Sequence, residues 1–202
     1  MSIRPPFGVP LETLIVSAIA VAIAEIGDKT QLLALVLAAR FRRPLPVILG
    51  ILVATLANHG LAAWLGSFVA GWLGGDGLRW IIGLSFIAMA VWIMVPDKPD
   101  DGPKLMGRCG PFLATLVAFF IVEIGDKTQV ATVALAARFN DLLLVTCGTT
   151  LGMMLVNVPA VLLGDVVATR VPLKLVHGIA ACLFAVLGIL ALADVGAVFA
   201  GT

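Results

Sequence analysis

The sequence predicts an all-α integral membrane protein whose six transmembrane helices form two inverted repeats of three helices. Three observations predict it. The chain is 61% apolar and 12% charged with a mean hydropathy of +1.12, it contains six long apolar stretches, and it carries the heptapeptide EIGDKTQ twice. Soluble domains are about 45–50% apolar and about 25% charged. Since the surface of a soluble domain needs more charge than this, lipid is the expected solvent.

The apolar stretches cover residues 11–39, 45–72, 78–95, 110–137, 142–168 and 173–193. About 20 helical residues cross a hydrocarbon core of about 30 Å, so each stretch suffices for one span. A β-barrel would show alternating segments of about ten residues instead. The breaks are rich in Pro, Gly, Asp, Asn and Arg, which favour loops. The longest break, 96–109, predicts a linker between a first repeat (1–95) and a second (110–202).

The remaining composition excludes several classes. A net charge of +1 and a pI near 7.7 give no basic patch for nucleic acid. Cys109, Cys147 and Cys182 stand singly, without CxxC spacing, so we expect neither a soft-metal site nor a disulfide framework. No short apolar stretch ends in a small-residue cleavage site near the N-terminus, so we expect no removable signal peptide.

The distribution of Lys and Arg predicts the orientation in the membrane. Loops after the first, third and fifth stretches hold more of these residues than the loops of the other side. The first group is Arg40, Arg42, Arg43, Lys98, Lys104, Arg108, Arg170 and Lys174, and the second is Arg4, Arg79 and Arg138. Because positive loops stay in the cytoplasm, both termini are expected outside it and the linker inside.

The two halves are related by an offset of 98 residues. EIGDKTQLLALVLAARF at 25–41 and EIGDKTQVATVALAARF at 123–139 share twelve of seventeen positions. The same offset pairs Gly50 with Gly148 and Phe86 with Phe184. Each unit holds three stretches, so the second must enter the membrane from the opposite side. Inverted repeats are typical of secondary transporters, whose sites lie near the midplane between the repeats.

Both copies of the heptapeptide are expected near mid-membrane. At 1.5 Å per residue, Glu25 and Glu123 lie about 20 Å along their helices. Ionised side chains at that depth cost several kcal/mol each unless they are paired or hydrated. Such a concentration of charge predicts a functional site.

On a continuous helix, Glu25 and Asp28 share a face, as do Glu123 and Asp126. Thr30 points away from that face in an unbroken helix, and Gly27 and Gly125 offer an alternative in which the turn loosens and exposes carbonyl oxygens. The four carboxylates and the amide oxygens of the glutamines form an oxygen-rich ligand set, and the motif contains no Cys or His. Such a set suits Ca²⁺ or Mn²⁺ rather than Zn²⁺ or Cu⁺. The expected metal ligands are Glu25, Asp28, Gln31, Glu123, Asp126 and Gln129, and the expected supporting residues are Lys29, Thr30, Lys127, Thr128, Asn58 and Asn157.

The charge of this cluster suggests a mechanism. Four carboxylates and two lysines sum to −2, which either one divalent cation or two protons would neutralise. Carboxylates that repel one another in a poorly solvated site hold protons tightly. Competition between metal and protons for one site is the chemical basis of an antiporter.

Structural roles are the alternative interpretation of these polar residues. Glu25 with Lys29 would form an ion pair that only fixes helix packing, but a buried pair stabilises poorly and this leaves Asp28 without a partner. Asn58 and His59 in the second stretch, and Asn157 at the position equivalent to His59, either support the site or hydrogen-bond between helices.

Two further function classes are alternatives to the antiporter. Asp28 and Asp126 could form an intramembrane aspartyl-protease dyad, but that chemistry needs neither glutamate, and nearby lysines would disturb a shared proton. An exporter of amino acids or of another small cation is a further alternative.

The doubled motif resembles the signature of the Gdt family of cation/proton antiporters, also known as uncharacterised protein family 0016. That signature, Glu-x-Gly-Asp-(Lys/Arg)-(Ser/Thr) in each half, stands here at residues 25–30 and 123–128. The resemblance implies exchange of Ca²⁺ or Mn²⁺ for protons, with the motif acids as ligands and no resident cofactor. This chain resembles the short bacterial-type members, which implies a Mn²⁺ exporter of the inner (plasma) membrane, with Ca²⁺ as the second choice.

Overall fold

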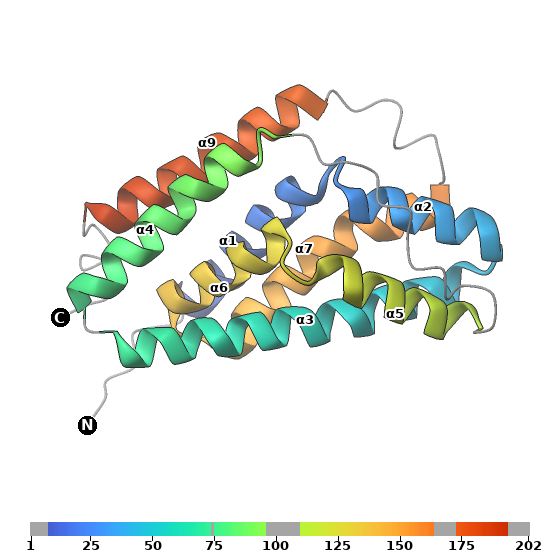
Figure 1. Cartoon of the computed structure of the whole chain (residues 1–202), viewed down its shortest axis with the longest axis horizontal. Coiled ribbons are helices and arrows are strands. Elements are labelled where there is room, and N and C mark those ends of the chain that lie inside the picture. The colour runs from blue at the N-terminus through green and yellow to red at the C-terminus, as the bar shows by residue number, and fades with distance from the viewer. Residues whose placement is uncertain (1–7, 74, 96–109, 164–172, 194–202) are drawn as a thin grey trace.

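The computed structural model describes residues 8–73, 75–95, 110–163 and 173–193 (Figure 1). All regular structure within these ranges is α-helical, which confirms the predicted class. The helices are α1 (Gly8–Glu25), α2 (Lys29–Phe41), α3 (Pro44–Trp72), α4 (Gly75–Trp92), α5 (Pro111–Glu123), α6 (Lys127–Phe139), α7 (Leu142–Leu163) and α9 (Leu173–Leu192). The expected linker, 96–109, lies outside the described residues.

Several helices are suited to crossing a membrane. By length and apolar composition, α3, α7 and α9 qualify singly among the described residues, and the pair α1–α2 qualifies as a fourth, bent span. The helices α4 and α5 are apolar but shorter. The chain is therefore a multi-pass membrane protein. The end of the fifth predicted stretch, 164–168, falls outside the described ranges.

Two of the predicted helices are broken. The stretch 11–39 divides into α1 and α2, which meet at a bend of 72°. The stretch 110–137 divides in the same way into α5 and α6. Gly27 and Gly125, in the middle of each break, have φ values of 81° and 76°. Only glycine adopts this left-handed region without steric cost. The helix is therefore not continuous through either motif, and the loosened turn expected as the alternative at Gly27 and Gly125 is what the structure has.

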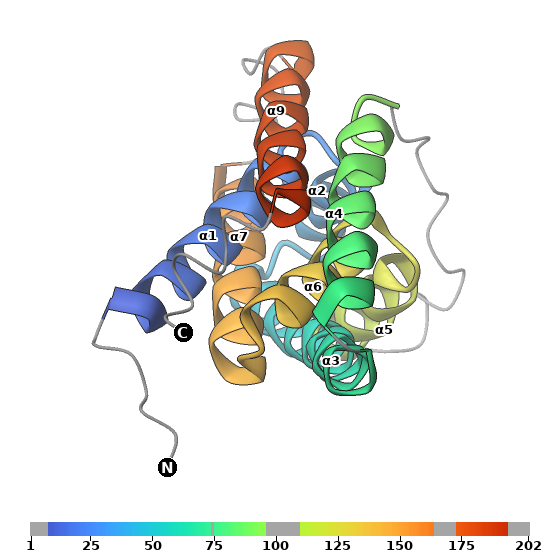
Figure 2. The ribbon, with the colours of Figure 1, turned by 90° about the vertical axis from the view of Figure 1, so that its left-hand side faces the viewer.

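The helices pack across the two halves of the chain. The main contacts join α1 to α7, α5 to α3, α4 to α9, and α3 to both α6 and α7. Figures 1 and 2 both show α4 and α9 running side by side along one edge of the bundle. The contact of α1 with α7 and that of α5 with α3 are equivalent under the offset of the repeats.

The same offset appears at the level of single atoms. A side chain on Gly50 of α3 would meet the carbonyl oxygen of Phe112 in α5 at 2.8 Å. A side chain on Gly148 of α7 would meet the carbonyl oxygen of Leu14 in α1 at 2.7 Å. The two glycines are 98 positions apart, and so are the two residues whose carbonyl oxygens they face. These glycines let a helix of one half approach the backbone of the other.

Phe86 of α4 and Phe184 of α9, another pair related by the offset, are fully buried and stack with their ring centroids 6.1 Å apart. Two residues related by the offset thus contact each other directly in the core.

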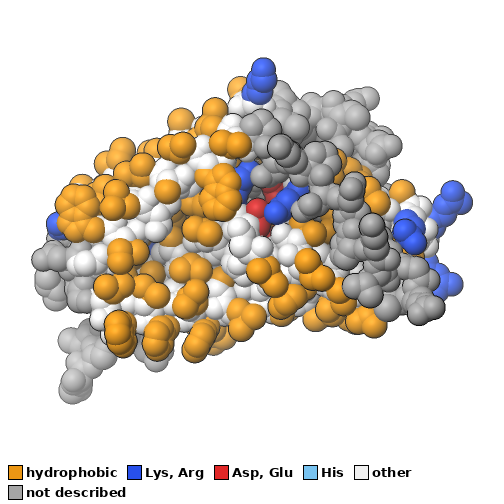
Figure 3. All heavy atoms as spheres, in the orientation of Figure 1, with side chains coloured by type: hydrophobic (Ala, Val, Ile, Leu, Met, Phe, Trp, Pro, Cys, Tyr) orange, Lys and Arg blue, Asp and Glu red, His pale blue; other side chains and the backbone are white. Residues whose placement is uncertain are grey.

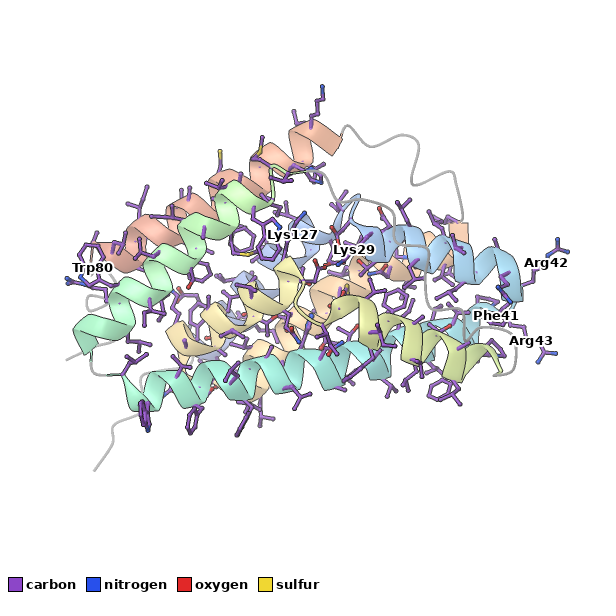
Figure 4. All side chains as sticks on the ribbon, viewed as in Figure 1. Lys29, Phe41, Arg42, Arg43, Trp80 and Lys127 are labelled. Atoms are coloured by element: carbon purple, nitrogen blue, oxygen red, sulfur yellow. The ribbon has the colours of Figure 1, made fainter. Side chains whose placement is uncertain are left out.

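The buried apolar side chains form two clusters. One is built mainly from α1, α4, α6 and α9, and the other mainly from α2, α3 and α5. The breaks join α1 to α2 and α5 to α6, so the motif residues lie where the two clusters meet. The position of the motifs along the bundle agrees with this placement. Figure 4 shows Lys29 and Lys127 about midway between Arg42 and Arg43 at one end of the bundle and Trp80 at the other.

Replacing Gly148 with alanine should destabilise the protein. The added methyl group would lie 2.7 Å from the Leu14 carbonyl oxygen and 2.8 Å from the Ser17 Cβ atom, and such overpacking costs about 1–3 kcal/mol. We expect a lower midpoint of thermal unfolding in detergent. The matched control is Gly178→Ala, because Gly178 of α9 has no atom within 4 Å of an added Cβ. Equal midpoints for the two variants would contradict the packing described here.

Candidate metal centre

Each copy of the motif places its two acids at helix ends. Glu25 ends α1 and Asp28 is the N-cap residue of α2. Glu123 ends α5 and Asp126 is the N-cap residue of α6. The expected arrangement on one helix face is therefore wrong. Asp28 and Asp126 instead lie at helix N-termini, where the partial positive charge of the helix dipole favours a carboxylate.

Glutamine side chains hold the breaks in shape. The Gly27 N–H donates to Oε1 of Gln31 at 2.9 Å, and the Gly125 N–H donates to Oε1 of Gln129 at 2.6 Å. Each amide oxygen satisfies a backbone donor that the break removes from the helical ladder. An amide oxygen has two lone pairs, so one remains for a cation. The structural role of the two glutamines was missed by the sequence reasoning.

The break also turns the motif threonines toward the glutamates. The Thr30 hydroxyl donates to Oε2 of Glu25 at 2.5 Å, and the Thr128 hydroxyl to Oε2 of Glu123 at 3.5 Å. Thr30 was expected to point away from the acidic face of an unbroken helix. Because the helix is broken, Thr30 instead contacts Glu25. Both threonines therefore orient the carboxylates that they contact.

Two ion pairs join the halves of the chain. Lys29 Nζ lies 3.3 Å from Asp126 Oδ1, and Lys127 Nζ lies 4.0 Å from Asp28 Oδ1. The two pairs are related by the offset of 98. The pairing with Asp126 gives Lys29 a partner in the other half, whereas the packing interpretation gave it Glu25 of its own motif. Because each lysine reaches the aspartate of the other half, the motifs are fixed face to face.

Three carboxylates converge between the lysines. One oxygen each from Glu25, Asp28 and Asp126 lies within 4.8 Å of the other two, and all three residues are buried. Glu123 is fully buried and close enough to Glu25 and Asp126 for electrostatic repulsion. Acidic groups crowded in this way, away from water, call for a cation or protons.

Unused oxygen atoms point to the same need. Oε1 of Glu25, Oε1 of Glu123 and Oδ2 of Asp126 are buried and have no hydrogen-bond donor within the described parts of the chain. Buried polar atoms are normally satisfied, so these oxygens are suited to bind an ion. Figure 3 shows acidic and basic side chains close together in a hollow near the middle of the face in view.

The polar residues of α3 and α7 differ in their contacts. Asn58 Nδ2 donates to the carbonyl oxygen of Phe120 in α5 at 3.1 Å, whereas Asn157 Nδ2 donates to the carbonyl oxygen of Met153 in its own helix at 3.0 Å. His59 is fully buried, and its Nε2 lies 3.6 Å from Oε2 of Glu123. Sequence reasoning placed His59 at mid-membrane but did not connect it with Glu123.

Comparison with known proteins agrees with this geometry. The family model described as "Divalent cation/proton antiporter GDT1" matches residues 13–101 and 111–198, one copy in each half. The chain belongs to this family. Membership supports a transporter rather than the aspartyl protease, and it confirms the resemblance drawn from the motifs.

Individual relatives extend over most of the chain. A Vibrio cholerae protein named "Putative manganese exporter" is 53% identical over 175 residues, covering 86% of this chain and 87% of the relative. A rice protein named "GDT1-like protein 3" is 28% identical over 200 residues, covering 86% and 71%. A GDT1-like protein of Synechocystis is 28% identical over 185 residues, covering 81% and 88%. No solved structure matches the chain.

The pair of Lys29 and Asp126 should show energetic coupling. Removing one partner leaves a buried charge uncompensated, whereas removing both does not. In a cycle of Lys29→Met, Asp126→Asn and the double variant, we expect a coupling of about 1–3 kcal/mol in the free energy of unfolding in mixed micelles. In the control cycle, Lys174→Met replaces Lys29→Met and is combined with Asp126→Asn, because Lys174 is exposed on α9. A coupling as small as that of the control would show that the pair does not join the halves.

Proposed function

We propose that this protein exchanges a divalent cation for protons at the buried site formed by Glu25, Asp28, Glu123 and Asp126. The observation that carries the proposal is the convergence of Glu25, Asp28 and Asp126, from both halves, to within 4.8 Å. An ion bound there is held by both repeats at once. It is therefore sensitive to any movement of one repeat against the other, as alternating access requires.

The side chains divide into ligands and supports. Carboxylate oxygens bind the ion directly, and the second lone pairs of Gln31 and Gln129 are available to complete its shell. Thr30 and Thr128 orient the two glutamates. Asn58 holds α3 against α5, and Asn157 lies on α7 at the position equivalent to His59. An oxygen-rich shell of this kind is typical of Mn²⁺ and Ca²⁺ sites.

Protons and metal compete for the same oxygens. Lys29 and Lys127 compensate two of the four negative charges, so the site carries −2 when all six groups are ionised. One divalent cation or two protons neutralise it. Binding of the ion releases protons, and binding of protons releases the ion, which is the exchange reaction of an antiporter.

The proposed cargo is Mn²⁺ first and Ca²⁺ second, and the proposed direction is export from the cytoplasm. The printed name of the Vibrio cholerae relative supports manganese and export. The excess of Lys and Arg in the loops after the first, third and fifth stretches supports a plasma membrane orientation with both termini outside the cytoplasm.

We also propose six spans in two inverted three-helix repeats. The broken pairs α1–α2 and α5–α6 each count as one span, together with α3, α4, α7 and α9. Supporting this are the two equivalent glycine contacts, the stacked pair Phe86–Phe184 and the two crossed ion pairs, all of which repeat at an offset of 98. The first repeat would cover 1–95 and the second 110–202, joined by the linker 96–109.

Neutralising Glu123 should stop transport. In liposomes with an acidic interior, wild-type protein should accumulate Mn²⁺, and collapsing the pH gradient should abolish the accumulation. Glu123→Gln and Asp126→Asn should lower the initial rate at least about 100-fold, because each removes a charge that is used only at this site. Gly178→Ala, which alters no site residue, is the control. Mn²⁺ uptake that ignores the pH gradient would exclude the exchange mechanism, and competition by lysine would indicate an amino-acid exporter instead.

A further inference from the structure

His59 is placed against the acidic site without an ordinary structural role. It lies in α3, is fully buried, and has its Nε2 3.6 Å from Oε2 of Glu123. Neither Nδ1 nor Nε2 has a hydrogen-bond partner among the residues that the structure describes. Buried polar groups are normally hydrogen-bonded, so an imidazole of this kind indicates a ligand.

The spacing fits an ion held by both side chains. A hydrogen bond between the ring nitrogen and the carboxylate would be about 2.7–3.2 Å long. Two donor atoms bound to one ion at about 2.1 Å each lie about 3.0–3.5 Å apart, for angles between octahedral and tetrahedral. The observed separation of 3.6 Å is longer than a hydrogen bond and close to the ligand spacing.

The two halves of the site are not identical at this position. The offset of 98 makes Asn157 of α7 the equivalent of His59. The amide nitrogen of Asn157 donates to its own helix, and its Oδ1 has no hydrogen-bond donor within the described ranges. One half therefore presents a nitrogen donor and the other an oxygen donor, although the two motifs are identical.

We propose that His59 supplies a nitrogen ligand to the transported ion beside Glu123 and thereby favours Mn²⁺ over Ca²⁺. Ca²⁺ takes oxygen ligands, whereas transition-metal ions also accept imidazole, with an affinity that rises from Mn²⁺ through Co²⁺ to Ni²⁺. A single imidazole in a set of carboxylates thus separates two ions of equal charge. This inference rests on the proposed function, because it assigns the ion selectivity of the same site.

A competition series tests the assignment. In liposomes, initial rates are measured for Mn²⁺, Co²⁺, Ni²⁺ and Ca²⁺ with wild type and His59→Asn, which copies the side chain of the other half. We expect the preference for Mn²⁺ over Ca²⁺ to fall at least about tenfold, and the losses for Co²⁺ and Ni²⁺ to be larger in that order. The control is His177→Asn on α9, which removes the other histidine of the chain and should leave all ratios unchanged.

An equal loss for Mn²⁺ and Ca²⁺, or no change in their ratio, would overturn the assignment and leave His59 a packing residue. Absence of metal transport by the wild type would instead overturn the proposed function itself.

A spectroscopic measurement needs no variant to remain active. Mn²⁺ bound to the wild-type protein should show nitrogen modulation from an imidazole in electron spin echo spectra. The modulation should persist in His177→Asn and disappear in His59→Asn. A wild-type spectrum of bound Mn²⁺ without imidazole nitrogen would overturn the proposal.

Discussion

Two lysines and four carboxylates share one buried site, and their compensation of one another's charge is the constraint on which the arrangement of the helices depends. Lys29 reaches Asp126 and Lys127 reaches Asp28, so charges of each half are compensated by the other half. In a low-dielectric interior, removing one partner of a buried charge pair costs about 3–5 kcal/mol. The halves must therefore face each other in one register, and the close contacts at Gly50 and Gly148 bring their backbones near enough to do so.

The helix breaks solve the problem of delivering these groups to one point. An unbroken helix would leave Glu25 and Asp28 on its side, one turn apart. Ending α1 at Glu25 and starting α2 at Lys29 lets both acids project from helix ends, while the N-terminus of α2 contributes favourable partial charge. The cost is a loss of backbone hydrogen bonds in a lipid-embedded segment, which must be satisfied internally. Gln31 meets that need at Gly27, and Gln129 does so at Gly125.

The sequence was sufficient to predict the helical class, the apolar stretches and the meeting of the two motifs, because hydropathy and a long polar repeat are strong signals in an apolar chain. The breaks were harder to predict, since glycine is tolerated in continuous transmembrane helices and only the backbone angle at Gly27 separates the two outcomes. The pairing of each lysine with the aspartate of the other half depends on how the two halves pack together. Spacings of i, i+4 within one helix do not predict it. His59 lies outside the motif, so nothing local connected it with Glu123.

The crossed ion pairs have a consequence for energetics at the scale of the cell. Each aspartate is already balanced by a lysine that stays with the protein, which leaves Glu25 and Glu123 as the two charges to be neutralised in each half of the cycle. Loading with one divalent ion or with two protons gives the same neutral site. The proposed exchange therefore moves no net charge across the bilayer, so the membrane voltage neither drives nor opposes it. Such a carrier would respond to the proton and metal concentrations on the two sides alone, and would continue to work in a depolarised cell.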